Sequence, residues 1–146
     1  MRFEVDNKKM DTHMKSKAKP EEKKVENKEG NHNISIKKKS NQNEIKLLIK
    51  GLGDENGLVR RSHAQALAQV GSAALPELIN ALLNSENVIQ RRAAAKTLKL
   101  LGNPKALPPL IKALTNDPDS VVQFSAAGAI AIFGEAAVNH LITVLE

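Results

Sequence analysis

The feature that most constrains this chain is a segment that recurs about every 31 residues. "VRRSHAQALAQVG" occupies residues 59–71, and "QRRAAAKTLKLLG" occupies residues 90–102 with the same paired arginines, alanines and closing glycine. A third copy, "VQFSAAGAIAIFG" at residues 122–134, has Gln123 and Phe124 in place of the arginines. This period indicates a supersecondary unit that buries its apolar face only by stacking on its neighbours.

Four other segments carry the apolar stripe of a helix, because residues at i, i+3, i+4 and i+7 share one face at 3.6 residues per turn. They are 45–52, 75–82, 107–114 and 138–145, and their Leu-Ile pairs are 30, 32 and 31 residues apart. The alanine-rich segments between them predict second helices, which pack closely through small side chains.

Turn residues separate these helices at regular places. Asn, Asp and Gly are concentrated in the turns within each pair, at residues 53–57, 84–87 and 116–120. A glycine stands where each second helix ends and a left-handed residue is favoured: Gly71, Gly102 and Gly134. Pro76 and Pro108 lie in the first turns of their helices, where a missing N–H is tolerated. The sequence therefore predicts an all-α fold, an α-solenoid of about three and a half helical-hairpin repeats over residues 43–146.

The N-terminal part has a different composition. Residues 1–43 hold twelve Lys or Arg against seven Asp or Glu, whereas residues 44–146 hold ten against nine. Its few apolar side chains are scattered, too few to offset the entropy of ordering the segment. We expect residues 1–42 to be a disordered Lys/Glu/Asn-rich tail. It is either a solvated linker or a segment in weak contact with nucleic acid, anionic lipid or an acidic protein.

Composition also narrows the functional classes. The absence of cysteine excludes disulfides, thiolate nucleophiles and cysteine metal sites. No long apolar stretch and no signal-type N-terminus occurs, so we expect a cytoplasmic protein without membrane insertion. The histidines lack ligand spacing, which argues against a metal site. Without Trp or Tyr, and with a net charge near +1, residues 44–146 are poorly suited to nucleic acid.

The turns carry a more specific pattern, an aspartate followed six residues later by an arginine, and this pattern resembles the short HEAT-like repeats. Asp54 and Arg60 reproduce that spacing. Two later pairs each keep half of it: Ser85 with Arg91, and Asp117 with Gln123. The stretches "NGLVRRSHAQAL", "RRAAAKTLKLLGNPKALPPLIKAL" and "DSVVQFSAAGAI" are similar to the phycobilisome-lyase type of this repeat, found in cyanobacterial bilin lyases and a related phycobilisome degradation protein. The similarity covers roughly residues 44–146.

The resemblance implies a structural ladder, in which the arginine of one repeat bonds to turn aspartates and carbonyls of its neighbour. The ladder residues are Asp54, Arg60, Arg91 and Asp117. Arg61 and Arg92 lie about 100° further round their helices and cannot point the same way. We predict that these two form a basic strip on adjacent second helices, which line the concave surface of such solenoids. Solvated surface charge is the alternative.

His63 is the third candidate binding residue, because its equivalents in the later repeats are Ala94 and Ala126. Its alternative explanation is simple tolerance of a histidine at an exposed position. For the whole chain, the resemblance implies a protein that binds a phycobiliprotein or its bilin, since a bilin carries two propionates and a phycobiliprotein surface is acidic. The bilin would be a substrate, not a covalently bound cofactor.

The role implied is bilin attachment, bilin detachment or phycobilisome turnover, with a phycobiliprotein subunit or a lyase partner subunit as partner. Enzymatic activity stays open, because the sequence offers no identifiable catalytic acid, base or nucleophile. A non-catalytic HEAT-repeat scaffold for another protein is the alternative function, and a DNA-binding HEAT-like protein is a third.

The last predicted helix has an apolar side that a following helix covers in the earlier repeats. Its residues are Leu141, Ile142 and Leu145. We expect this side to be exposed and to be covered by a second copy, by a partner subunit, or by the rest of a longer chain.

Overall fold

The structure is a computed structural model that describes the backbone of residues 30–146 and the side chains from residue 41 onward. Backbone contacts divide the chain into two units, Met1–Ile34 and Ser35–Glu146. Every element in the described part is helical: α2 (Gly30–Gly51), α3 (Gly57–Val70), η1 (Gly71–Ala74), α4 (Leu75–Asn84), α5 (Val88–Leu101), η2 (Pro104–Ala106), α6 (Leu107–Asn116), α7 (Ser120–Ala131) and α8 (Glu135–Leu145). The predicted all-α class and each predicted helix are confirmed.

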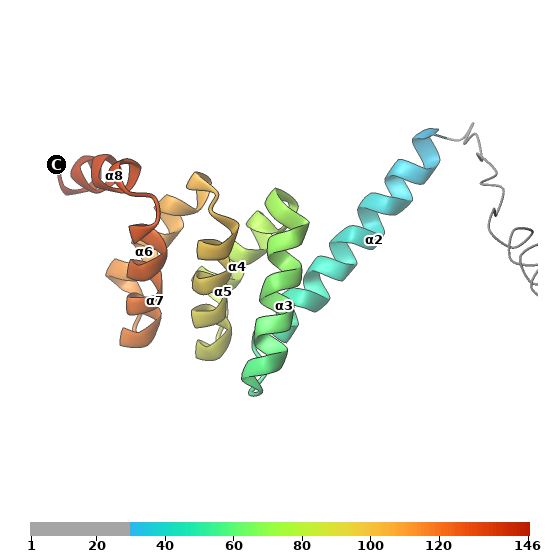
Figure 1. The fold of residues 1–146 in the computed structure, drawn as a ribbon, viewed down its shortest axis with the longest axis horizontal. Helices are drawn as coiled ribbons and strands as arrows, with labels where there is room; N and C mark the ends of the chain where they lie inside the picture. Colours follow the sequence, from blue (N-terminus) through green and yellow to red (C-terminus); the bar gives the residue numbers. More distant parts are fainter. Residues whose placement is uncertain (1–29) are drawn as a thin grey trace, which may run out of the picture. The chain divides into compact units, whose positions relative to one another are not determined.

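The helices of the second unit alternate between two layers (Figure 1). α3 contacts α5 and α5 contacts α7, so these three form one layer, while α4 and α6 form the other and α8 contacts α6 and runs across the end of the stack. The layers meet within each repeat, where α4 packs on α5 and α6 packs on α7. This arrangement confirms an α-solenoid of three helical hairpins and one further helix. We call α3, α5 and α7 the second-helix layer.

The buried core between the layers combines large and small side chains, and both layers contribute to each kind. The first helices contribute fully buried Ile and Leu residues: Ile45, Leu52, Leu78, Leu82 and Leu110. The second helices contribute fully buried alanines: Ala94, Ala95, Ala126 and Ala129. Each buried Leu or Ile contributes about 1.5–3 kcal/mol of apolar burial. The small residues opposite let the two layers approach closely, as the alanine-rich pattern predicts.

Each second helix begins with a side-chain cap. The Oδ1 atoms of Asn56, Asn87 and Asp119 each accept a backbone N–H two residues later at 2.9 Å. These bonds satisfy donors that the first turn of a helix leaves without an internal partner. The sequence analysis identified these turns but not their capping residues.

Glycines end the second-helix segments as predicted, with φ of 80° at Gly71, 65° at Gly102 and 54° at Gly134. Only Gly102 is in the left-handed helical region, with ψ of 22°. The other two have ψ of −144° and −123°, a region that is essentially open to glycine alone. The need for glycine is therefore confirmed at all three positions, and the left-handed conformation at one.

The predicted boundary at residue 42 does not coincide with a helix end. α2 begins at Gly30 and ends at Gly51, so residue 42 lies within it. No Pro or Gly interrupts residues 31–50, and a helix, once nucleated, adds residues at little cost. Residues 1–29 of the predicted tail lie outside the described residues.

The stretch Gly57–Asn84 is long and apolar enough in composition to cross a membrane. The structure breaks it into α3 and α4, with η1 between them and a positive φ at Gly71. It is therefore not a single continuous span.

The side of α8 predicted to be exposed is exposed in part. Ile142 and Leu145 are exposed, at 50% and 84%, whereas Leu141 is half-buried and packs against the core. Helix α8 rests on α6, and the side chain of Leu141 lies on the covered side.

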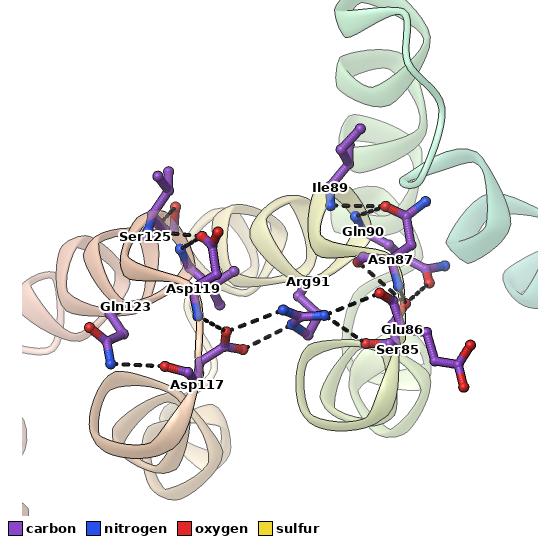
Figure 2. Close-up of polar contacts among 12 residues, drawn as sticks. Ser85, Glu86, Asn87, Ile89, Gln90, Arg91, Asp117, Asp119, Gln123 and Ser125 are labelled. Atoms are coloured by element: carbon purple, nitrogen blue, oxygen red, sulfur yellow. Dashed lines mark hydrogen bonds and ion pairs between the residues drawn. The ribbon is translucent and has the colours of Figure 1, made fainter.

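Arg91 joins the second and third repeats (Figure 2). Its Nε and Nη2 donate to Asp117 Oδ2 and Oδ1 at 3.0 and 3.3 Å, and its Nη1 donates to the Ser85 carbonyl at 3.0 Å. The two charged side chains are only 13% and 6% exposed. One guanidinium therefore holds the turn of its own repeat and the turn of the next one.

Arg60 makes no such link between repeats. Its Nη1 donates to the carbonyls of Asp54 and Glu55, at 2.7 and 2.8 Å, within its own turn. The residue equivalent to Asp117 in the next repeat is Ser85, which carries no charge to pair with it. The predicted ladder is thus incomplete at the first joint.

Neutral side chains hold this first joint instead. Asn87 Nδ2 donates to the Gly53 carbonyl at 3.2 Å, and Gln90 Nε2 donates to the Ile49 carbonyl at 2.8 Å. Both acceptors lie at or just beyond the C-terminal end of α2, and the Ile49 carbonyl also accepts the Leu52 N–H at 3.1 Å.

The two arginines therefore differ in what they contribute to stability. We expect Arg91→Ala to lower the free energy of unfolding by about 3 kcal/mol, because it leaves the shielded Asp117 carboxylate unpaired. Arg60→Ala should cost about 1 kcal/mol, because only bonds to exposed carbonyls are lost. Urea unfolding followed by helical circular dichroism measures both. Equal losses in the two variants would contradict this assignment.

Candidate functional site

A groove of about 590 Å³ lies between α3 and α5 on the second-helix layer. We call it the basic groove, because five of its side chains are cationic and one is a carboxylate. The cationic residues are Arg60, Arg61, Arg92, Lys96 and Lys99, the carboxylate is Glu55, and the remaining lining residues are Gly57, Ala64, Ile89, Ala93 and Leu100. The structure thus brings Arg61 and Arg92 together, as the basic strip requires.

Helical spacing explains why these side chains meet. On α5 the lining positions 89, 92, 96 and 100 recur every three to four residues and therefore share one face. On α3 the positions 57, 60, 61 and 64 do the same on the side that faces α5. The contact between the two helices places the second arginine of each repeat on the same groove.

The cations of the groove are poorly neutralised within the described part of the chain. Among residues 41–146, Arg91–Asp117 is the one ion pair. Arg92 Nε is buried and finds no hydrogen-bond partner among those residues. A buried donor without an acceptor costs about 1–3 kcal/mol. The groove therefore favours a ligand that brings negative charge and hydrogen-bond acceptors.

The groove also presents apolar surface between its cations. Ile89, Ala64 and Ala93 line it, and Leu100 lines its edge with 59% of its surface exposed. Guanidinium groups suit carboxylates because their paired N–H donors match the two oxygens. The combination fits an anion that carries an apolar body, in contrast to a small inorganic ion.

His63 does not join this site. It lines a separate groove together with Gly51, Asn87 and Gln90. Its Nδ1 lies 2.7 Å from the Val59 carbonyl oxygen, and since a carbonyl can only accept, Nδ1 donates. The third candidate of the sequence analysis is thus apart from Arg61 and Arg92.

Packing against α2 accounts for this histidine. A Cβ at Gly51 would overlap the His63 ring, so the imidazole occupies the space that glycine leaves. Both later repeats have alanine at both equivalent positions, and all of these alanines are buried: Ala81 with Ala94, and Ala113 with Ala126. In the first repeat, a glycine and a histidine thus take the place of the two alanines found in each later repeat. The alternative explanation for His63, tolerance of a histidine at an exposed position, therefore does not hold, because the side chain packs against α2.

Comparison with known proteins identifies the repeat. Residues 75–146 match the family model of HEAT repeats, and residues 59–84 match that of the PBS lyase HEAT-like repeat. Residues 59–146 are therefore built from HEAT-like repeats. The phycobilisome-lyase type expected from the sequence is matched by residues 59–84, and Arg60 and Arg61 fall inside the matching repeat.

Individual relatives point the same way. The chain is similar to the bilin biosynthesis protein MpeU of Synechococcus sp. (strain WH8020), with 48% identity over 62 residues, which are 42% of this chain and 21% of MpeU. It is also similar to a solved structure, the complex of CpcE and CpcF of phycocyanin lyase from Nostoc sp. PCC7120. That match has a TM-score of 0.55 at 30% identity and covers 59% of this chain and 50% of the other. The chain therefore spans about a fifth of MpeU and half of the lyase chain.

The packing of His63 on Gly51 predicts a compensating pair of substitutions. Gly51→Ala should destabilise the chain by about 1–3 kcal/mol, because the new methyl group overlaps the imidazole. Adding His63→Ala should restore most of that loss, since the pair then has the alanines of the later repeats. Urea unfolding of both single variants and the double variant measures the interaction energy. Additive losses would show that the two residues do not share this space.

Proposed function

We propose that this chain is a HEAT-repeat protein that binds a phycobiliprotein or its bilin chromophore, in bilin attachment, bilin detachment or phycobilisome turnover. The observation that carries the proposal is the basic groove, where Arg61 and Arg92 meet among five cationic side chains. The relatives are named for bilin biosynthesis and for phycocyanin lyase, and these names suggest the class of ligand.

The chemistry of a bilin matches the groove. A bilin is an open-chain tetrapyrrole whose two propionates are carboxylates, and a guanidinium binds a carboxylate through two parallel hydrogen bonds. The apolar lining residues Ile89 and Leu100 offer contact to its rings. The excess of cations would also attract the acidic surface of a phycobiliprotein subunit and speed its encounter with this face.

A protein partner is part of the proposal. The similar lyase structure is a complex of two proteins, CpcE and CpcF. We propose that this chain likewise works with another protein, either the phycobiliprotein subunit that carries the bilin or a lyase partner subunit.

Charge-matched variants test the function. In the full-length chain, Arg61→Ala with Arg92→Ala should weaken binding of a free bilin and of an apo-phycocyanin subunit by about tenfold or more, because charge-assisted hydrogen bonds are lost. Lys46→Ala with Lys105→Ala removes the same charge from exposed positions outside the groove and should leave both affinities unchanged. Titration followed by bilin absorbance, with melting curves as a folding check, measures this. Equal effects of the two double variants would contradict a role for the groove.

A further inference from the structure

The second-helix layer changes character at its third repeat. The position that holds Arg61 in α3 and Arg92 in α5 holds Phe124 in α7. α7 packs beside α5, so Phe124 lies on the helix next to the basic groove. Its side chain is 78% exposed, although burial of a phenylalanine is favourable.

Gly128, one turn after Phe124, is equivalent to the groove-lining Lys96. Glycine is less favourable than alanine inside a helix. Gly128 is not among the positive-φ glycines of this part of the chain, and a Cβ added to it would meet no atom within 4 Å. Neither backbone conformation nor internal packing therefore requires glycine here. Because Gly128 has no side chain, the space over this part of the α7 backbone is open.

Two more apolar residues extend the same face of α7. Val121 precedes Phe124 on the helix and is 41% exposed, and Ile132, the residue that directly follows the last residue of α7, is 46% exposed. We call these four residues the apolar strip. Their equivalents in α5 all line the basic groove: Ile89, Arg92, Lys96 and Leu100. The strip therefore continues the face of the groove, with uncharged residues in place of the cations, and α7 contains no charged residue.

Building on the proposed function, we infer that the bilin itself binds across this layer in one orientation. Its propionates lie in the basic groove at Arg61 and Arg92, and its conjugated rings lie on the apolar strip, stacked on Phe124 and over Gly128. Packed helices are about 8–10 Å apart, so one extended tetrapyrrole reaches from the groove to the strip. An acidic protein surface would match the cations but not the uncharged strip, which favours the chromophore as the occupant.

The contact that each part of the ligand makes can be assigned with two probes. Biliverdin carries two free propionates, and its dimethyl ester has the same rings without those charges. The full-length chain should bind biliverdin about tenfold tighter than the ester, and Arg61→Ala with Arg92→Ala should abolish that preference. Phe124→Ala should weaken both probes by a similar factor, about tenfold, because both keep the stacked rings. Leu145→Ala, which truncates an exposed apolar residue of α8, should weaken neither.

A second variant tests the open space without removing a contact. Gly128→Leu should weaken both probes while the melting midpoint stays the same or rises, because leucine favours the helix and the fold leaves room for its first carbon. Visible absorbance and the induced circular dichroism of the bilin measure all variants.

Unchanged affinities in Phe124→Ala and Gly128→Leu would overturn the orientation and leave the proposed function intact. A Phe124→Ala variant that keeps its affinity for both bilin probes but binds an apo-phycocyanin subunit more weakly would also overturn the orientation. The strip would then contact protein. If the unaltered chain binds neither biliverdin nor the phycocyanin subunit, the proposed function itself is overturned.

Discussion

The pair between Arg91 and Asp117 is the contact on which the geometry of the binding face depends. Arg91 and Arg92 are adjacent but point about 100° apart, so anchoring the first between two turns directs the second toward the groove. The same pair fixes the turn before α7 relative to α5, and thereby the place of Phe124 beside Arg92. A shielded charge pair has one well-defined geometry, and it holds the two parts of the face in register.

The two joints between repeats meet the same requirement with different chemistry. At the second joint a guanidinium bonds to a carboxylate, whereas at the first joint the amides of Asn87 and Gln90 bond to carbonyls near the end of α2. At each joint a side-chain donor of one repeat bonds to acceptors in the turn region of the neighbouring repeat. A donor of either kind meets that requirement. The repeat pattern can therefore lose half of its aspartate-arginine signature, as it does at Ser85, without losing the stack.

The periodicity of the sequence predicted the features that depend on local sequence, namely the positions of the helices and of equivalent residues on them. The apolar stripes and the alanine-rich segments between them located the helices of the stack, and the shared repeat position of Arg61 and Arg92 predicted that they would meet. Contacts between distant positions were not predictable in the same way. The packing of His63 depends on Gly51, on a different helix, and the missing link of Arg60 depends on which residue occupies the next turn.

Equivalent positions in a solenoid are free to differ wherever they face outward, because the buried core and the joints between repeats hold the stack together. In this chain the buried Leu, Ile and Ala positions recur with little change, while the outward position changes from Arg61 to Arg92 to Phe124. The changes bring features that the fold does not need: cations without carboxylate partners in the described residues, an exposed phenylalanine and a helical glycine without a packing contact. Each is mildly unfavourable in the isolated chain, and one amphipathic ligand would compensate for all of them. Their coincidence on one layer is therefore better explained by a ligand than by the requirements of folding.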